Sequence, residues 1–144
     1  VQNIFLVEDN PIISHLYRAK LTDEGFQVEL AEDGLKAIKW LATAKPDLVV
    51  LDLMLPILNG VDVLKYIRSR PDLKSLPVIL LSEAYMSDLA RQAETVGVEQ
   101  TLLKSACTPK LLLGIVNGIL AGRPCIIDPS LQLAVSSAPS IKPG

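Results

Sequence analysis

Three carboxylates, one hydroxyl and one amine in this sequence each follow an apolar run directly. Glu8 and Asp9 follow IFLV, and Asp52 ends the run DLVVLD. Ser82 ends PVILLS, and Lys104 follows QTLL. If these runs are parallel strands of one open sheet, ligands bind outside their carboxyl ends. We therefore expect the five side chains to meet at one edge of a sheet.

The chemistry of such a group is constrained by charge. Three adjacent carboxylates repel one another and cannot all stay ionised without a cation. A hard divalent ion with oxygen ligands is the simplest remedy, and Mg²⁺ takes few carboxylates and keeps several waters. Beside Mg²⁺, a free carboxylate could attack a phosphorus atom in line, while the amine and the hydroxyl stabilise the phosphoryl oxygens. Each residue alone has an ordinary structural explanation, but their joint placement favours a phosphoryl-transfer site.

The elements that must position these residues alternate regularly between apolar runs and helical periodicity. Pro11 begins a helix with Ile13, Leu16 and Leu21 at three- and four-residue spacing, and a helix from Asp33 to about residue 44 places Leu35 among its inward residues. This alternation predicts an α/β fold, a doubly wound five-stranded parallel sheet with helices on both faces. The predicted strands cover 4–7, 27–31, 47–52, 77–82 and 100–103, and the last three helices follow residue 60, cover about 87–96 and cover 109–120.

Composition limits the domain count and the partners. The 144 residues carry a net charge of −2, with 49% apolar and 4% aromatic residues. This length predicts one domain, and the near-neutral charge argues against direct nucleic-acid binding or attraction to a membrane. Cys107 and Cys125 have no metal-ligand spacing, and the first residues do not form a signal peptide, so we expect a cytoplasmic location.

A change of composition after Gly122 predicts a boundary. Residues 123–144 are rich in proline and small residues, which is typical of a tail or linker. We therefore expect a domain over 1–122 and a Pro/Ser-rich tail or linker over 123–144, with a short strand near 131–135.

Five segments, in order, carry a resemblance to a known family: IFLVEDNP, AEDGLKAI, DLVVLDLMLPILNG, LPVILLSEA and GVEQTLLKSA. From Asn3 to about Leu120 the chain resembles the receiver domain of two-component response regulators, of the chemotaxis-regulator type. The resemblance implies a flavodoxin-like fold with strand order 2-1-3-4-5. It also implies a phosphoacceptor that assists its own phosphorylation and dephosphorylation, not an enzyme acting on other substrates.

The resemblance implies roles for single residues. Asp52 matches the phosphoacceptor, which takes a phosphoryl group from a partner's phosphohistidine. Glu8, Asp9 and the backbone carbonyl of Met54 match the ligands that hold Mg²⁺ together with Asp52. Ser82 matches the residue whose hydroxyl responds to the phosphoryl group. Lys104 matches the lysine that pairs with the phosphoryl oxygens.

The implied partners are proteins: a sensor histidine kinase or phosphotransfer protein, and a downstream target or output domain. The apolar last helix suggests a surface for a partner protein or for a homodimer. Two positions depart from the family: Thr101 replaces the usual aromatic switch residue, and Ser105 replaces the proline after the lysine. The Lys104–Ser105 bond is therefore expected to be either trans in a rearranged loop or cis and strained.

Two other functions stay open. An aspartyl-phosphate hydrolase acting on small molecules usually has a second acid two residues after its nucleophile, and Met54 at that position argues against this alternative. A receiver-like binding module that no longer uses phosphorylation would fit the departures at Thr101 and Ser105.

Overall fold

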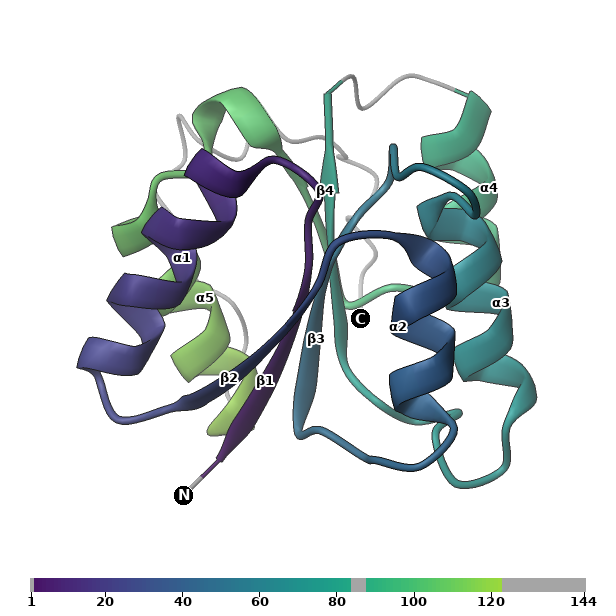
Figure 1. The fold of residues 1–144 in the computed structure, drawn as a ribbon, viewed down its shortest axis with the longest axis horizontal. Coiled ribbons are helices and arrows are strands. Elements are labelled where there is room, and N and C mark those ends of the chain that lie inside the picture. Colours follow the sequence, from purple (N-terminus) through teal and green to yellow (C-terminus); the bar gives the residue numbers. More distant parts are fainter. Residues whose placement is uncertain (1, 84–87, 123–144) are drawn as a thin grey trace.

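The structure is a computed structural model that describes residues 2–83 and 88–122. Its five strands form one parallel sheet in the order β2-β1-β3-β4-β5, as predicted (Figure 1). The strands are β1 (Asn3–Val7), β2 (Gln27–Ala31), β3 (Leu48–Asp52), β4 (Val78–Ser82) and β5 (Gln100–Leu103). The helices are α1 (Pro11–Asp23), α2 (Gly34–Leu41), α3 (Gly60–Ser69), α4 (Asp88–Val96) and α5 (Pro109–Leu120), with a 3₁₀ turn, η1 (Lys104–Ala106), after β5.

Alternation along the strands divides the core between the two faces of the sheet. In β1, Ile4 and Leu6 pack with α1 and α5, whereas Phe5 and Val7 pack with α2, α3 and α4. Residues of β3 and β4 are fully buried throughout, as expected for central strands of a sheet covered on both faces. This doubly wound sheet confirms the predicted fold class.

Side-chain caps fix where the helices begin. Asn10 accepts hydrogen bonds from the N–H groups of Ile12 and Ile13, and Pro11 occupies the first helical position of α1. Asp33 caps α2 and Thr108 caps α5 in the same way. The chain therefore turns sharply into α1 immediately after Glu8 and Asp9, the residues of interest.

Two details of the predicted helix faces are wrong. Leu16 is exposed, and the buried face of α1 consists of Ser14, Tyr17 and Leu21 at the i, i+3, i+7 positions. Leu35 is also exposed, because the buried face of α2 consists of Gly34, Ala37 and Leu41. The side chain of residue 35 points about 100° away from the position of residue 34 around the helix axis. The helix also ends at Leu41, three residues before the predicted end at 44.

Some predictions concern residues that the structure does not describe. The tail at 123–144, the short strand near 131–135 and the predicted start of the fourth helix at Ser87 lie outside the described residues. Within the described ranges, the helices are all too short or too polar to cross a membrane.

Candidate functional site

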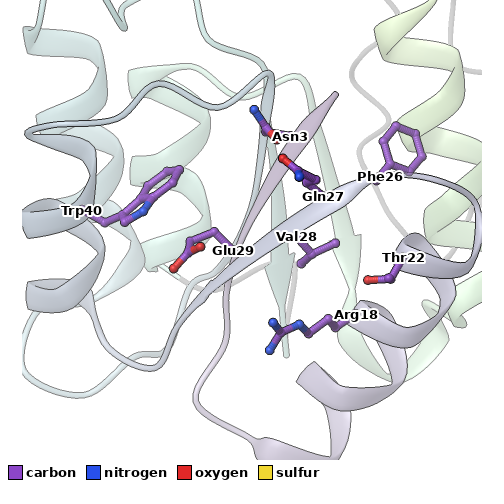
Figure 2. A pocket seen from close by; sticks show the side chains of 8 residues that line it. All are labelled: Asn3, Arg18, Thr22, Phe26, Gln27, Val28, Glu29 and Trp40. Atoms are coloured by element: carbon purple, nitrogen blue, oxygen red, sulfur yellow. The ribbon is translucent and has the colours of Figure 1, made fainter. Parts of the chain in front are cut away.

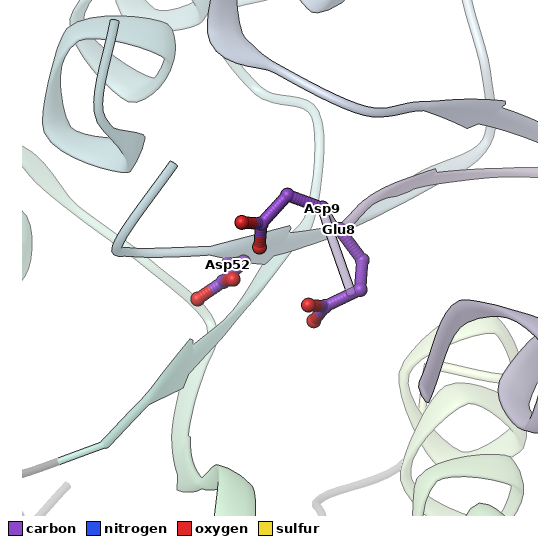
Figure 3. A group of neighbouring side chains, drawn as sticks. All are labelled: Glu8, Asp9 and Asp52. Atoms are coloured by element: carbon purple, nitrogen blue, oxygen red, sulfur yellow. The ribbon is translucent and has the colours of Figure 1, made fainter. Parts of the chain in front are cut away.

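The carboxyl ends of β1 and β3, which are neighbours in the sheet, bring three carboxylates together. Glu8 and Asp9 directly follow β1, and Asp52 is the last residue of β3. One oxygen from each of the three lies within 4.8 Å of the others (Figure 3). Glu8 and Asp52 are buried and Asp9 is exposed, so the cluster is open to solvent on the side of Asp9.

Lys104 completes this cluster from the end of β5. Its Nζ lies 3.0 Å from Oε2 of Glu8 and 3.0 Å from Oδ2 of Asp52. The lysine side chain is 9% exposed and both of these carboxylate side chains are 0% exposed, so water screens these ion pairs weakly. Three carboxylates face one ammonium, which leaves two negative charges uncompensated, the charge that one divalent cation would balance.

Burial and crowding shift the ionisation of these groups. Burial, followed by the charge of Asp52, raises the pKa of Glu8 to about 7. Burial also raises the pKa of Asp52, although the hydrogen bond from Lys104 opposes this effect. For Lys104, burial acts to lower the pKa, but the hydrogen bonds to Asp52 and Glu8 outweigh it and the pKa is raised. The ammonium therefore stays charged, while the raised pKa values of Glu8 and Asp52 favour the binding of a proton by this buried pair.

Backbone N–H groups orient two of the carboxylates. The N–H of Asn10 donates to Oε2 of Glu8, at 3.1 Å, and the N–H of Met54 donates to Oδ1 of Asp52, at 3.2 Å. The second oxygen of Glu8, Oε1, is buried without a hydrogen-bond partner within the described residues. A buried carboxylate oxygen without a partner, in an all-oxygen acidic donor set, suits a hard cation such as Mg²⁺.

The hydroxyl predicted for this site also lies at this edge of the sheet. Ser82 is buried at the end of β4, and β4 adjoins both β3 and β5. Thr101 lies two residues before the end of β5 and pairs in register with Leu80. The Thr101 side chain is buried, and within the described part of the chain its hydroxyl has no hydrogen-bond partner.

The missing hydrogen bond gives a prediction for Thr101. Thr101→Val removes the hydroxyl and keeps the branched shape, so we expect stability to stay unchanged or to rise by up to about 1 kcal/mol. Urea unfolding of the two proteins measures this difference. A loss of more than about 1 kcal/mol would mean that the hydroxyl has a partner in solution.

The turn after Lys104 resolves the two alternatives for the Lys104–Ser105 bond. The described residues contain no cis peptide bond, so this bond is trans. The chain instead forms the 3₁₀ turn η1, in which the N–H of Cys107 donates to the carbonyl of Lys104 at 3.3 Å. The rearranged loop still brings the lysine ammonium to Asp52.

Gly60 is packed against the backbone of the site. A Cβ atom at this position would lie 2.5 Å from the carbonyl oxygen of Asp52 and 2.7 Å from Cα of Leu53. Both are backbone atoms, so a side-chain movement cannot relieve the clash. The glycine therefore lets α3 begin directly beside the strand end that carries Asp52.

Gly60→Ala is expected to destabilise the domain by about 2 kcal/mol, because the strand end must shift to accept the methyl group. Gly114→Ala is the matched control, since a Cβ at Gly114 in α5 would meet no atom within 4 Å. The control is expected to stabilise the domain by about 0.5–1 kcal/mol. Chemical denaturation of both variants measures the difference, and equal stabilities would contradict the packing argument.

Two contacts near the cluster were not predicted from the sequence. Glu83 lies 3.8 Å from Nζ of Lys104, and its side chain is exposed. Its position directly after Ser82 was the available signal. Tyr17 donates a hydrogen bond from its hydroxyl to the carbonyl of Cys107 in the loop after Lys104. No sequence pattern indicates this contact between residues 90 positions apart.

A doubly wound parallel sheet with three carboxylates and a lysine at its carboxyl edge defines a class of phosphoryl-accepting signalling domains. The comparisons with known proteins agree with this class. The sequence model of the response regulator receiver domain matches residues 4–116. The chain therefore belongs to the response regulator receiver domain family and is a receiver domain of two-component signal transduction.

The chain is similar to several full-length transcriptional regulators. It is 30% identical to the phosphate regulon transcriptional regulatory protein PhoB of Rhizobium meliloti, over 90% of this chain and 57% of that protein. It is also 30% identical to the transcriptional regulatory protein CusR of Escherichia coli, over 91% of this chain and 57% of that protein. The chain thus spans about three-fifths of the length of these relatives.

Solved structures of receiver domains superpose closely. The receiver domain of a signal transduction histidine kinase from Syntrophus aciditrophicus has a TM-score of 0.78 and 27% identity, covering 85% of this chain and 92% of that one. That of a sensor histidine kinase from Pseudomonas aeruginosa has a TM-score of 0.76 and 27% identity, covering 83% and 98%. The latter structure has a magnesium ion coordinated in its active-site cleft.

Proposed function

We propose that Asp52 accepts a phosphoryl group from a partner's phosphohistidine, and that this event switches a protein-interaction surface of the domain. The observation that carries the proposal is the position of Asp52, a buried carboxylate 3.0 Å from a nearly buried lysine, within an acidic cluster. An aspartate with a purely structural role would not need two further carboxylates and the Lys104 ammonium around it.

In the proposed reaction, an oxygen of the Asp52 carboxylate attacks the phosphorus atom of the phosphohistidine. An oxygen–phosphorus bond forms, the nitrogen–phosphorus bond breaks, and its electron pair leaves with the imidazole. The Lys104 ammonium offsets the negative charge on the phosphoryl oxygens, and the Ser82 hydroxyl offers them a hydrogen bond. Water can later attack the same phosphorus atom: the bond between phosphorus and the Asp52 oxygen then breaks, inorganic phosphate leaves and the carboxylate is restored, which makes the signal self-limiting.

We further propose that Mg²⁺ is the cation of this site. Glu8, Asp9, Asp52 and the backbone carbonyl of Met54 would hold it, since all offer oxygen atoms, and Glu8 has a buried oxygen without a hydrogen-bond partner. When bound, the ion would neutralise part of the charge that builds up on the transferring phosphoryl group. The magnesium ion of the Pseudomonas aeruginosa receiver domain supports the choice of metal.

The pKa of Glu8 predicts how Mg²⁺ binding depends on pH. Since the carboxyl group titrates near pH 7, a proton competes with the metal, and affinity should rise about tenfold from pH 6 to pH 8. Without metal, the Glu8 carboxylate binds a proton more tightly in the folded state than in the unfolded state, where the pKa of this group is 4.5. Stability at low ionic strength should therefore fall as pH rises from 4.5 towards 7.

Calorimetric titration with Mg²⁺ at several pH values measures the first effect. Glu8→Gln should bind the ion more weakly and lose most of the pH dependence. Glu32→Gln, a change at an exposed carboxylate that pairs with Lys36, should behave as the wild type does. An affinity that is constant from pH 6 to pH 8 in the wild type would contradict the assignment.

The exposed apolar side chains near the cluster support a protein as the phosphodonor. Ile12, in the first turn of α1, is 71% exposed, and Ile57, in the loop after Asp52, is 70% exposed. Ile57 also has a φ of 70°, a conformation that a branched residue rarely adopts. We propose a sensor histidine kinase or phosphotransfer protein as this partner, and a downstream target or output domain that recognises the phosphorylated form. A homodimer through α5 and a cytoplasmic location stay predictions.

Incubation with acetyl phosphate and Mg²⁺, followed by intact mass spectrometry, tests the proposal. We expect the mass of one phosphoryl group to be added, and chelation of Mg²⁺ to prevent this. Turnover of a phosphate monoester without labelling would support the small-molecule hydrolase instead. Failure to label at all, even by a phosphorylated histidine kinase, would support the binding module that no longer uses phosphorylation.

A further inference from the structure

A tyrosine outside the carboxylate cluster is tied to the loop that carries the lysine. Tyr17 lies on the buried face of α1 and is 3% exposed. Its hydroxyl donates a hydrogen bond to the carbonyl oxygen of Cys107, at 2.7 Å. Burial raises the pKa of Tyr17 far above the neutral range, so the hydroxyl remains a donor. Core packing alone would be served equally well by a phenylalanine.

The carbonyl that accepts this bond belongs to the turn that presents Lys104. The last strand pairing of β5 is that of Leu103 with Ser82, so Lys104 is the first residue beyond the sheet. The turn η1 then covers Lys104–Ala106, has no side-chain cap, and ends at Cys107, whose N–H donates to the carbonyl of Lys104. Ser105, which is exposed, leaves the backbone dihedral φ at this position freer than a proline would. The Tyr17 hydroxyl therefore ties the far end of this turn to α1, in addition to the packing of Cys107 in the core.

The same helix also holds the carboxylate side of the cluster. α1 begins at Pro11, and the N–H of the preceding Asn10 donates to Glu8. Tyr17 lies about two turns further along this helix and packs in one core cluster with residues of α5, the helix that follows the lysine loop. The helices α1 and α5 lie side by side (Figure 1). The N-cap residue of α1 thus contacts Glu8, and α1 itself contacts the lysine loop through Tyr17. One helix is therefore linked by hydrogen bonds both to Glu8 and to the loop that carries Lys104.

We propose that Tyr17 is a positioning residue for phosphorylation, which holds the Lys104 turn in the geometry that places the ammonium against Asp52. This inference rests on the proposed function of the site. The Tyr17 hydroxyl donates to the carbonyl of Cys107, so its proposed effect passes through the turn that carries Lys104. The hydroxyl, not the aromatic ring, is the group that carries the effect.

Tyr17→Phe tests the inference, because it removes the hydroxyl and keeps the ring. At saturating Mg²⁺ and acetyl phosphate, we expect the phosphorylation rate to fall about tenfold, since small misplacements of a charge-stabilising group are costly. Affinity for Mg²⁺ should change less than about twofold, because the substitution alters none of the oxygen atoms proposed to hold the ion. Tyr66→Phe is the matched control, because Tyr66 lies on α3 and its hydroxyl accepts a hydrogen bond from Arg70 at the end of that helix. The phosphorylation rate of this variant should equal that of the wild type.

A double-mutant cycle with Lys104→Ala separates positioning from general stability. If Tyr17 acts through the lysine, Tyr17→Phe should have no further effect on the rate once Lys104 is replaced. A wild-type rate for Tyr17→Phe, additive losses in the cycle, or failure of this variant to fold would each overturn the inference. A wild-type protein that is not phosphorylated on Asp52 would instead overturn the proposed function, before any variant is made.

Discussion

Replacing Asp52 with asparagine is expected to abolish Mg²⁺-dependent phosphorylation, lowering the rate by roughly a thousandfold or more. The amide is a very weak nucleophile compared with the carboxylate, and it also removes one of the three negative charges of the cluster. The substitution should not disturb the fold. Asparagine has almost the same shape, and its oxygen can accept the hydrogen bond that the N–H of Met54 donates to Asp52.

Asp47→Asn provides the control for this result. Asp47 directly precedes β3, at the opposite end of the strand from Asp52, and its carboxylate is exposed and accepts from the N–H of Asn3. Intact mass spectrometry after incubation with acetyl phosphate and Mg²⁺ should show labelling of this variant as in the wild type. Labelling of Asp52→Asn at the wild-type rate would remove Asp52 from the proposed role.

Lys104→Ala is expected to affect both activity and stability. The ammonium lies 3.0 Å from both Glu8 and Asp52, so its loss removes the cation proposed to stabilise the phosphoryl oxygens. The loss of one such group typically slows a reaction by about a hundredfold. Without Mg²⁺ we also expect the domain to lose about 2 kcal/mol of stability, less than the roughly 3–5 kcal/mol for breaking a buried ion pair. The smaller value reflects the raised pKa of Glu8, which can bind a proton in place of the lost cation.

Added Mg²⁺ should restore part of this lost stability, because it supplies the missing positive charge to the same carboxylates. Lys36→Ala, which breaks the exposed pair with Glu32, is expected to change stability by less than about 0.5 kcal/mol. Thermal unfolding with and without Mg²⁺, together with the labelling rate, measures all of these effects. A Lys104→Ala variant that is as stable and as rapidly labelled as Lys36→Ala would contradict the account.

Much of the fold and of the site geometry could be predicted because both follow from strand position. Apolar runs separated by capped helices specify a parallel sheet, and a parallel sheet brings its carboxyl ends to one edge. The residues following IFLV and DLVVL therefore had to become neighbours, and the structure brings Glu8, Asp9 and Asp52 together as expected. The buried position of Ser82 and the approach of Lys104 follow from the same rule.

Details that depend on tertiary packing could not be predicted in this way. Helical spacing alone did not show that Tyr17, and not Leu16, faces inward on α1, since the choice depends on the space beside α5. The conformation after Lys104 depends on a contact between Tyr17 and Cys107, which are far apart in the sequence. Such long-range contacts leave no local pattern, yet this one determines how the lysine is presented.

Locating the phosphoryl group in the wild-type protein tests directly whether Asp52 is the phosphoacceptor. The chain would be incubated with acetyl phosphate and Mg²⁺, the acyl phosphate reduced with borohydride, and the digested peptides sequenced by mass spectrometry. We expect a single modified residue, Asp52, and no modification when Mg²⁺ is chelated. Modification at Glu8, Asp9 or a residue outside the cluster, with Asp52 unmodified, would contradict this assignment.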